Sequence, residues 1–129
     1  MSAKATILLL EDEPLILMDL EFAAEELGCE PYCATTVAQA LTYLERDAPP
    51  INVAVLDVTL QDGENCLPVA RELERRGIPY LLHSGDLNRQ NERIRELDAE
   101  LIPKPASSER VIGRAMEYVE DTKAHCSTR

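Results

Sequence analysis

The stretch INVAVLDVTLQDG, residues 51–63, carries the strongest indication of the fold. It opens with an almost unbroken apolar run, Ile51 to Leu56, in which valine recurs. Such a run is typical of a β-strand that is covered on both faces, near the centre of a parallel sheet. The run stops at Asp57 and leads into a polar turn. We therefore predict a central strand that presents a carboxylate at its carboxyl end.

Short apolar runs alternate with amphipathic segments on both sides of this stretch. The other predicted strands are Thr6 to Leu10, Glu30 to Ala34, Ile78 to Leu82, and a short one at Leu101 and Ile102. The predicted helices are Pro14 to Leu27, Val37 to Arg46, Asn65 to Arg76, residues 88–97, and Ser107 to Tyr118. Such alternation implies parallel strands with right-handed crossovers. The predicted fold is α/β, a doubly wound (βα)5 three-layer sandwich whose parallel five-stranded sheet has the flavodoxin-like order 2-1-3-4-5.

Length and composition indicate one globular domain. The 129 residues, 45% apolar and 29% charged, suit a single domain over residues 1–129, with a core at about 5–120 and a polar tail at 121–129. A net charge of −11 disfavours direct nucleic-acid binding. The apolar run Ile7 to Leu10 ends at once on acidic residues, so we expect neither a leader nor a membrane span, and a cytoplasmic location. The four cysteines lack paired CxxC spacing, and reduced thiols are expected.

Residues able to handle phosphate or a metal follow the predicted strands. Glu11 and Asp12 follow the first strand, Asp57 the third, Ser84 the fourth and Lys104 the fifth. The carboxyl ends of parallel strands share one edge, where such sheets bind ligands. We therefore expect these side chains to converge.

Three carboxylates at one edge need positive charge beside them. Two unit charges about 4 Å apart repel by roughly 4 kcal/mol at an effective dielectric constant of about 20. Lys104 supplies one positive charge, and a divalent cation bound only by oxygen, which suits Mg²⁺, would supply the rest. A carboxylate beside Mg²⁺ can accept a phosphoryl group, and Lys104 and the Ser84 hydroxyl would then engage its oxygens.

Four motifs resemble the response regulator receiver (CheY-like) family. They are ILLLEDEP at 7–14, VAVLDVTLQDG at 53–63, YLLHSGD at 80–86 and LIPKP at 101–105, in the order and spacing of that family. The resemblance covers about residues 5–120. It implies a stand-alone receiver of a two-component phosphorelay, a phosphoacceptor signalling protein rather than an enzyme.

The resemblance also implies a role for each motif residue. Asp57 would be the phosphoacceptor, with Asp12 as a direct Mg²⁺ ligand, Glu11 a ligand through water and Thr59 a ligand through its backbone carbonyl. Ser84 would be the switch hydroxyl, Lys104 would pair with the phosphoryl group, and the bond before Pro105 would be cis.

Four positions bear on switching and on the lifetime of the aspartyl phosphate. Leu101 stands where receivers with a rotating aromatic residue have Tyr or Phe, and Ala106 stands where Phe is common. Thr59 and Asp86 occupy positions from which receivers often tune hydrolysis. By contrast, His83 is expected to be a packed, hydrogen-bonded histidine.

The implied partners are a histidine kinase or a histidine phosphotransfer protein, and a downstream protein that binds the face formed by the last two helices and the fifth strand. Signalling and a phosphate-sink role both remain open. One alternative is a receiver-like binding module that is not phosphorylated. Another is a phosphatase of the haloacid-dehalogenase type, which would need a second acid where Thr59 stands.

Overall fold

The computed structural model describes residues 4–46, 50–58, 60, 64–85, 97 and 99–127. Five strands form one sheet in which all neighbours are parallel, in the order β2-β1-β3-β4-β5. This confirms the predicted flavodoxin-like fold. The strands are β1 (Thr6–Leu10), β2 (Glu30–Ala34), β3 (Val53–Asp57), β4 (Tyr80–Ser84) and β5 (Leu101–Pro103).

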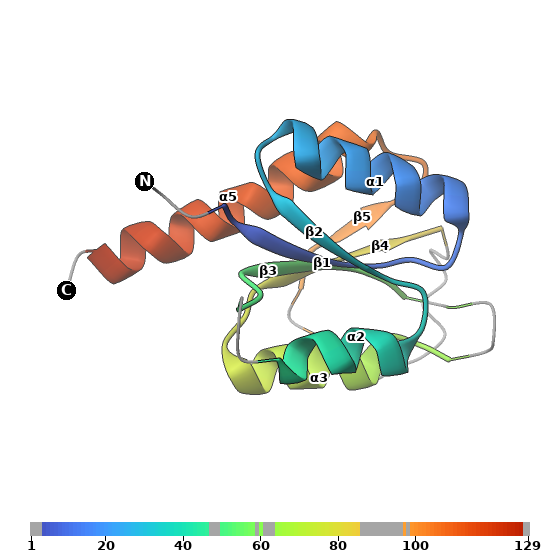
Figure 1. The fold of residues 1–129 in the computed structure, drawn as a ribbon, viewed down its shortest axis with the longest axis horizontal. Coiled ribbons are helices and arrows are strands. Elements are labelled where there is room, and N and C mark those ends of the chain that lie inside the picture. Colours follow the sequence, from blue (N-terminus) through green and yellow to red (C-terminus); the bar gives the residue numbers. More distant parts are fainter. Residues whose placement is uncertain are drawn as a thin grey trace.

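Helices cover both faces of the sheet, as Figure 1 shows. α1 (Pro14–Glu26) and α5 (Ser108–Ser127) lie on one face, and α2 (Val37–Glu45) and α3 (Leu67–Arg76) lie on the other. The helix predicted at 88–97 falls outside the described residues except for Leu97, whose side chain is buried in the core. No helix in the described ranges is long and apolar enough to cross a membrane.

Strand alternation divides the apolar core into two parts. Ile7 and Leu9 of β1 face the core under α1 and α5, whereas Leu8 and Leu10 face the core under α2 and α3. All residues of β1, β3 and β4 are buried. A strand covered on both faces has no side turned to water, which is why these strands are mostly apolar and carry polar residues chiefly at their ends.

Several boundaries differ from the prediction by one or two residues; β3, predicted at Ile51 to Leu56, is Val53–Asp57. Two of the differences have local reasons. β4 starts at Tyr80 rather than Ile78, because Pro79 has no N–H to donate to the ladder and contributes only its carbonyl, which accepts from the backbone N–H of Ala54. α3 begins at Leu67 rather than Asn65, because the Asn65 side chain accepts a hydrogen bond from the Leu67 N–H and so stands before the helix.

The carboxyl-terminal end departs most from expectation. The sequence predicted a last helix ending at Tyr118 and a fraying polar tail over residues 121–129, but α5 continues to Ser127. No proline or glycine follows Gly113, so nothing in the sequence terminates the helix there. The polar composition of this segment was therefore a poor guide to where the helix ends.

Candidate functional site at the carboxyl edge of the sheet

An acidic cluster lies at the carboxyl ends of β1 and β3. Carboxylate oxygens of Glu11, Asp12 and Asp57 all lie within 4.8 Å of one another. The parallel pairing of β1 with β3 sets Leu10 opposite Leu56, so the residues that follow these two are neighbours. The predicted convergence of the three carboxylates is present in the structure.

Glu11 is fixed at this edge by its backbone and its burial. Its N–H donates to the Ala34 carbonyl at 3.0 Å, which extends the pairing of β1 with β2 by one residue. Its side chain is 1% exposed, and its Oε2 accepts a hydrogen bond from the Glu13 N–H at 3.2 Å. The carboxylate therefore closes the turn into α1 as well as belonging to the cluster.

Lys104 reaches the cluster from the far side of β4. Its Nζ lies 3.0 Å from Glu11 Oε1, 3.5 Å from Asp57 Oδ2 and 3.9 Å from Glu13 Oε1. Its backbone N–H donates to the Ser84 carbonyl at 2.9 Å, so the pairing of β4 with β5 positions it. The Lys104–Pro105 peptide bond is cis, as the resemblance implied.

The electrostatics of the cluster favour a bound cation. Burial, and next the negative charge of Glu11, raise the pKa of Asp57 to about 7, although Lys104 acts to lower it. Burial alone would lower the pKa of Lys104, but its ion pair with Glu11 and the charge of Asp57 raise it. Within the described residues, one ammonium group thus faces three carboxylates.

The donor set fits Mg²⁺. Mg²⁺ binds oxygen ligands, usually one or two carboxylates together with water and phosphate oxygens, whereas zinc favours His and Cys. Glu11, Asp12 and Asp57 supply oxygen only, and the raised pKa of Asp57 shows that a further positive charge would be favourable there. The backbone carbonyl predicted from Thr59 lies outside the described residues.

The remaining predicted positions fall into two groups. Ser84 ends β4, is 2% exposed and is joined to Lys104 through the backbone, so it lies at the same edge. Leu101 is half-buried and packs against the core under α2 and α3. Asp86 lies outside the described residues.

Two neighbours of the site were not predicted from the sequence. Glu13 is an additional carboxylate beside Lys104 and is exposed, whereas Glu11 and Asp57 are buried and Asp12 is half-buried. Cys66 is fully buried, and burial followed by the negative charge of Asp57 raises the pKa of its thiol to about 12. Its place directly before α3 could have suggested this, because the first residues of such helices also lie at the carboxyl edge.

His83 is packed as predicted but not hydrogen-bonded. Its side chain is 3% exposed, and neither ring nitrogen has a hydrogen-bond partner in the part of the chain that the structure describes. The prediction that its ring is hydrogen-bonded is therefore wrong. The three cysteines with described side chains, Cys29, Cys33 and Cys66, are free thiols, as expected.

A parallel sheet of this order with three carboxylates and a lysine at its carboxyl edge defines a receiver domain. Comparison with solved structures agrees: the chain is similar to SdrG from Sphingomonas melonis Fr1, with 37% identity and a TM-score of 0.74 over 92% of this chain and 98% of that one. The chain belongs to the response regulator receiver family.

Two further structures are similar. The response regulator PhyR from Brucella abortus shares 27% identity at a TM-score of 0.75, over 96% of this chain and 52% of PhyR. A response regulator receiver protein from Sinorhizobium medicae WSM419 shares 23% identity at a TM-score of 0.78, over 91% of this chain and 95% of that one, which supports the fold. No family model matches the sequence, and no curated protein matches it.

Proposed function

We propose that residues 1–129 form one receiver domain that accepts a phosphoryl group on Asp57 from a histidine kinase or a histidine phosphotransfer protein. The observation that carries the proposal is the position of Asp57, 5% exposed, whose carboxylate lies within 4.8 Å of those of Glu11 and Asp12 and 3.5 Å from Lys104 Nζ at the carboxyl edge of the sheet. We infer a cytoplasmic signalling protein that assists its own phosphorylation and dephosphorylation and is otherwise not an enzyme.

In the proposed transfer, a carboxylate oxygen of Asp57 attacks the phosphorus of the donor's phosphohistidine. The bond from phosphorus to the imidazole nitrogen breaks, and its electron pair stays on that nitrogen. Lys104 Nζ, 3.5 Å from Asp57 Oδ2, is placed to neutralise a phosphoryl oxygen, and the Ser84 hydroxyl is the switch group that engages another.

Mg²⁺ would be held by Asp12 and Asp57, by Glu11 through water and by the backbone carbonyl of Thr59. When bound, it supplies positive charge that keeps Asp57 ionised and balances the phosphoryl oxygens. The excess of carboxylates over the single ammonium group in the described cluster supports this assignment.

The donor must cover the start of α1. Its imidazole has to reach Asp57, and α1 begins directly after the acidic turn, with Leu15 76% and Met18 61% exposed. These apolar side chains suit a protein surface laid across the carboxyl edge.

The downstream target would bind β5 and α5, together with the helix predicted at 88–97. The described part of this face holds a charged network in which Arg114 Nε donates to Glu100 at 2.7 Å and the Tyr118 hydroxyl donates to the same oxygen at 2.9 Å. Rearrangement of this network would change the surface that a partner meets. Because residue 101 is Leu and has no aromatic ring, the proposed switch would work without rotation of an aromatic side chain at this position.

The test is intact mass after incubation with Mg²⁺ and acetyl phosphate. Wild type is expected to gain one phosphoryl group, Asp57→Asn none, and Glu45→Gln, which removes an exposed carboxylate at the end of α2, the same as wild type. No gain in wild type, repeated with a phosphorylated histidine phosphotransfer protein, would favour the alternative of a receiver-like binding module.

Asp86 and Thr59 are proposed to tune the lifetime of the aspartyl phosphate. If so, Asp86→Ala changes the rate at which the phosphorylated protein loses its phosphoryl group, measured by mass after removal of the donor. An unchanged rate would leave Asp86 as a turn residue.

A further inference from the structure

We propose that Glu13 is a specificity-determining residue, whose negative charge at the mouth of the site disfavours small anionic phosphodonors. The inference rests on the proposed phosphorylation of Asp57 and concerns which donors react with it. Three carboxylates lie beside Lys104 Nζ, and Glu13 is the exposed one: its side chain is 54% exposed, whereas Glu11 and Asp57 are buried. Glu13 thus lies on the side of Lys104 that faces solvent, from which a donor arrives.

The backbone holds Glu13 in this place. Its N–H donates to Glu11 Oε2 at 3.2 Å, and its carbonyl accepts a hydrogen bond from the Leu17 N–H at 3.0 Å as α1 begins. Pro14 follows directly and restricts the residue before it to extended conformations, and Glu13 has φ −86° and ψ 115°. The short stretch from Glu11 to Pro14 therefore determines where this charge lies.

The side chain of Glu13 does not cap the helix that it precedes. Glu13 occupies the N-cap position of α1, but in the described part of the chain its carboxylate accepts no capping hydrogen bond from the helix. Its ion pair with Lys104, at 3.9 Å, is one that water reaches, and such pairs contribute little to stability. Replacement of Glu13 by Gln keeps the shape and removes the charge, so the fold should be retained.

An incoming phosphoryl group comes close to this charge. In the proposed transfer Lys104 neutralises a phosphoryl oxygen, and a charge-assisted contact of this kind spans about 3 Å. Because Glu13 Oε1 lies 3.9 Å from the same nitrogen, that phosphoryl oxygen is at most about 7 Å from Glu13. The separation is shorter than the Debye length of about 8 Å at physiological ionic strength, so salt screens it only partly. Glu13 therefore repels the donor and also competes with it for Lys104.

The repulsion affects small donors most. A donor protein gains binding energy from contacts outside the reacting group, for example with the exposed Leu15 and Met18 on α1. Acetyl phosphate has little besides its phosphoryl group with which to offset the repulsion. Glu13 thus favours phosphorylation of Asp57 by a protein over phosphorylation by free acyl phosphates.

The test compares Glu13→Gln with wild type in time courses of intact mass, at a Mg²⁺ concentration that saturates both proteins. The rate constant with acetyl phosphate should rise roughly three- to tenfold. The rate constant with phosphoramidate, which carries less negative charge at neutral pH, should rise less. The rise with acetyl phosphate should shrink between about 0.1 M and about 1 M salt, because the Debye length falls from about 10 Å to about 3 Å. A change in packing alone would depend on neither donor charge nor salt.

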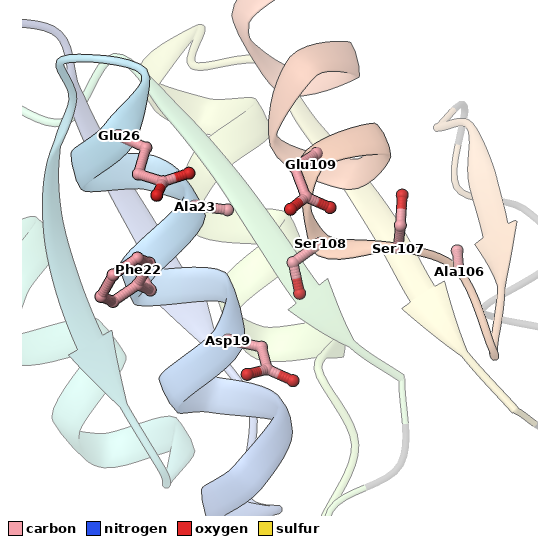
Figure 2. A pocket seen from close by; sticks show the side chains of 8 residues that line it. All are labelled: Asp19, Phe22, Ala23, Glu26, Ala106, Ser107, Ser108 and Glu109. Atoms are coloured by element: carbon pink, nitrogen blue, oxygen red, sulfur yellow. The ribbon is translucent and has the colours of Figure 1, made fainter.

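Glu26→Gln is the matched control. It makes the same change at the other end of α1, about 20 Å along the helix axis. Figure 2 shows Glu26 on the last turn of α1, beside a groove that Asp19 and Glu109 also line. The control therefore removes one exposed charge from a surface that is also acidic, and both rate constants should stay those of wild type.

Acetylphosphonate gives a readout without phosphoryl transfer. It resembles acetyl phosphate but lacks the bridging oxygen and cannot phosphorylate Asp57. Its dissociation constant is measured from nuclear magnetic resonance shifts of the backbone amides of Glu13 and Lys104. Glu13→Gln should bind it roughly three- to tenfold more tightly than wild type or Glu26→Gln does.

Two outcomes would overturn the inference and leave phosphorylation of Asp57 standing. One is a ratio of the acetyl phosphate to the phosphoramidate rate constant that Glu13→Gln leaves unchanged. The other is an equal rise in Glu13→Gln and Glu26→Gln. If neither donor phosphorylates wild type, the proposed function fails instead, and equal binding of acetylphosphonate by wild type and Glu13→Gln would then overturn the charge effect as well.

Discussion

Two groups of charged residues in this molecule behave in opposite ways. On α3, Glu72 pairs with both Arg75 and Arg76, and hydrogen bonds, first from Arg75, lower the pKa of its carboxyl to about 2. At the carboxyl edge of the sheet, Asp57 lies 3.5 Å from Lys104, yet its pKa is raised to about 7. The ionised form of a carboxyl group beside a cation is thus favoured on α3 and disfavoured at the carboxyl edge of the sheet.

Burial and the balance of charge account for the difference. The α3 group has two guanidinium groups for one carboxylate and is more open to water than the edge cluster, with side chains 67% exposed for Arg75, 33% for Arg76 and 24% for Glu72. In the edge cluster Glu11 and Asp57 are buried and Asp12 is half-buried, and in the described residues the cluster has three carboxylates for one ammonium group. The first arrangement stabilises itself, whereas the second is incomplete without a ligand, which is typical of functional sites.

The largest expected effect is that of Asp57→Asn on stability without a divalent cation. Between pH 3.8 and about 7 the folded protein keeps a proton on Asp57 that the unfolded chain has lost, so the free energy of unfolding falls as pH rises through this window. The difference between the folded and unfolded pKa values of Asp57 corresponds to a loss of as much as about 4 kcal/mol in the free energy of unfolding by pH 8. Asp57→Asn should remove this decline in the free energy of unfolding. Urea unfolding of both proteins at pH 4 and pH 8, in the presence of a chelator, measures it. An equal decline in the variant would contradict the assignment.

Lys104→Met should lower the free energy of unfolding, whereas Asp57→Asn should raise it at high pH. It leaves Glu11 and Asp57 buried without their cation, and removing one partner of a buried ion pair costs about 3 kcal/mol or more. The loss should be smaller at pH 5, where Asp57 is protonated. Urea unfolding at pH 5 and pH 8 measures the loss of stability, with Arg75→Met as the surface control. If the control lowers stability as much as Lys104→Met, the contrast between the two groups does not hold.

The sequence predicted the edge cluster but not its surroundings. Glu11, Asp12, Asp57 and Lys104 follow recognisable strands, and parallel pairing alone brings such positions together. The pocket beside His83 depends instead on how α1 packs against the start of α5, which sequence periodicity does not encode.

The fold was predictable for a similar reason. The apolar runs of β1 and β3 are short, and that of β3 is rich in valine, which favours strands covered on both faces; β1 and β2 have the predicted bounds. The length of α5 was not predictable from polarity, because a helix ends where a residue breaks it or a cap stops it, and polar residues alone do neither.

Mg²⁺ should stabilise the wild-type chain by binding the edge cluster, which the charged group on α3 cannot do. At a concentration one hundred times its dissociation constant, a ligand of the folded state adds about 2.7 kcal/mol. Asp12→Asn should lose most of this gain, and Glu45→Gln should keep it. Thermal unfolding in MgCl₂, against NaCl of equal ionic strength, measures the difference. Equal stabilisation of Asp12→Asn and wild type would mean that Mg²⁺ does not bind at the cluster.

The smallest expected effect is that of Glu72→Gln. Its pKa is lowered, so Glu72 contributes stability that is fully present above its ordinary value of 4.5 and is lost as pH falls towards about 2. Its partners are exposed arginines, and water screens such pairs strongly. The urea midpoint at pH 7 should therefore move far less than with Lys104→Met, and the difference should shrink further in high salt. A shift as large as that of Lys104→Met would mean that burial does not distinguish the two groups.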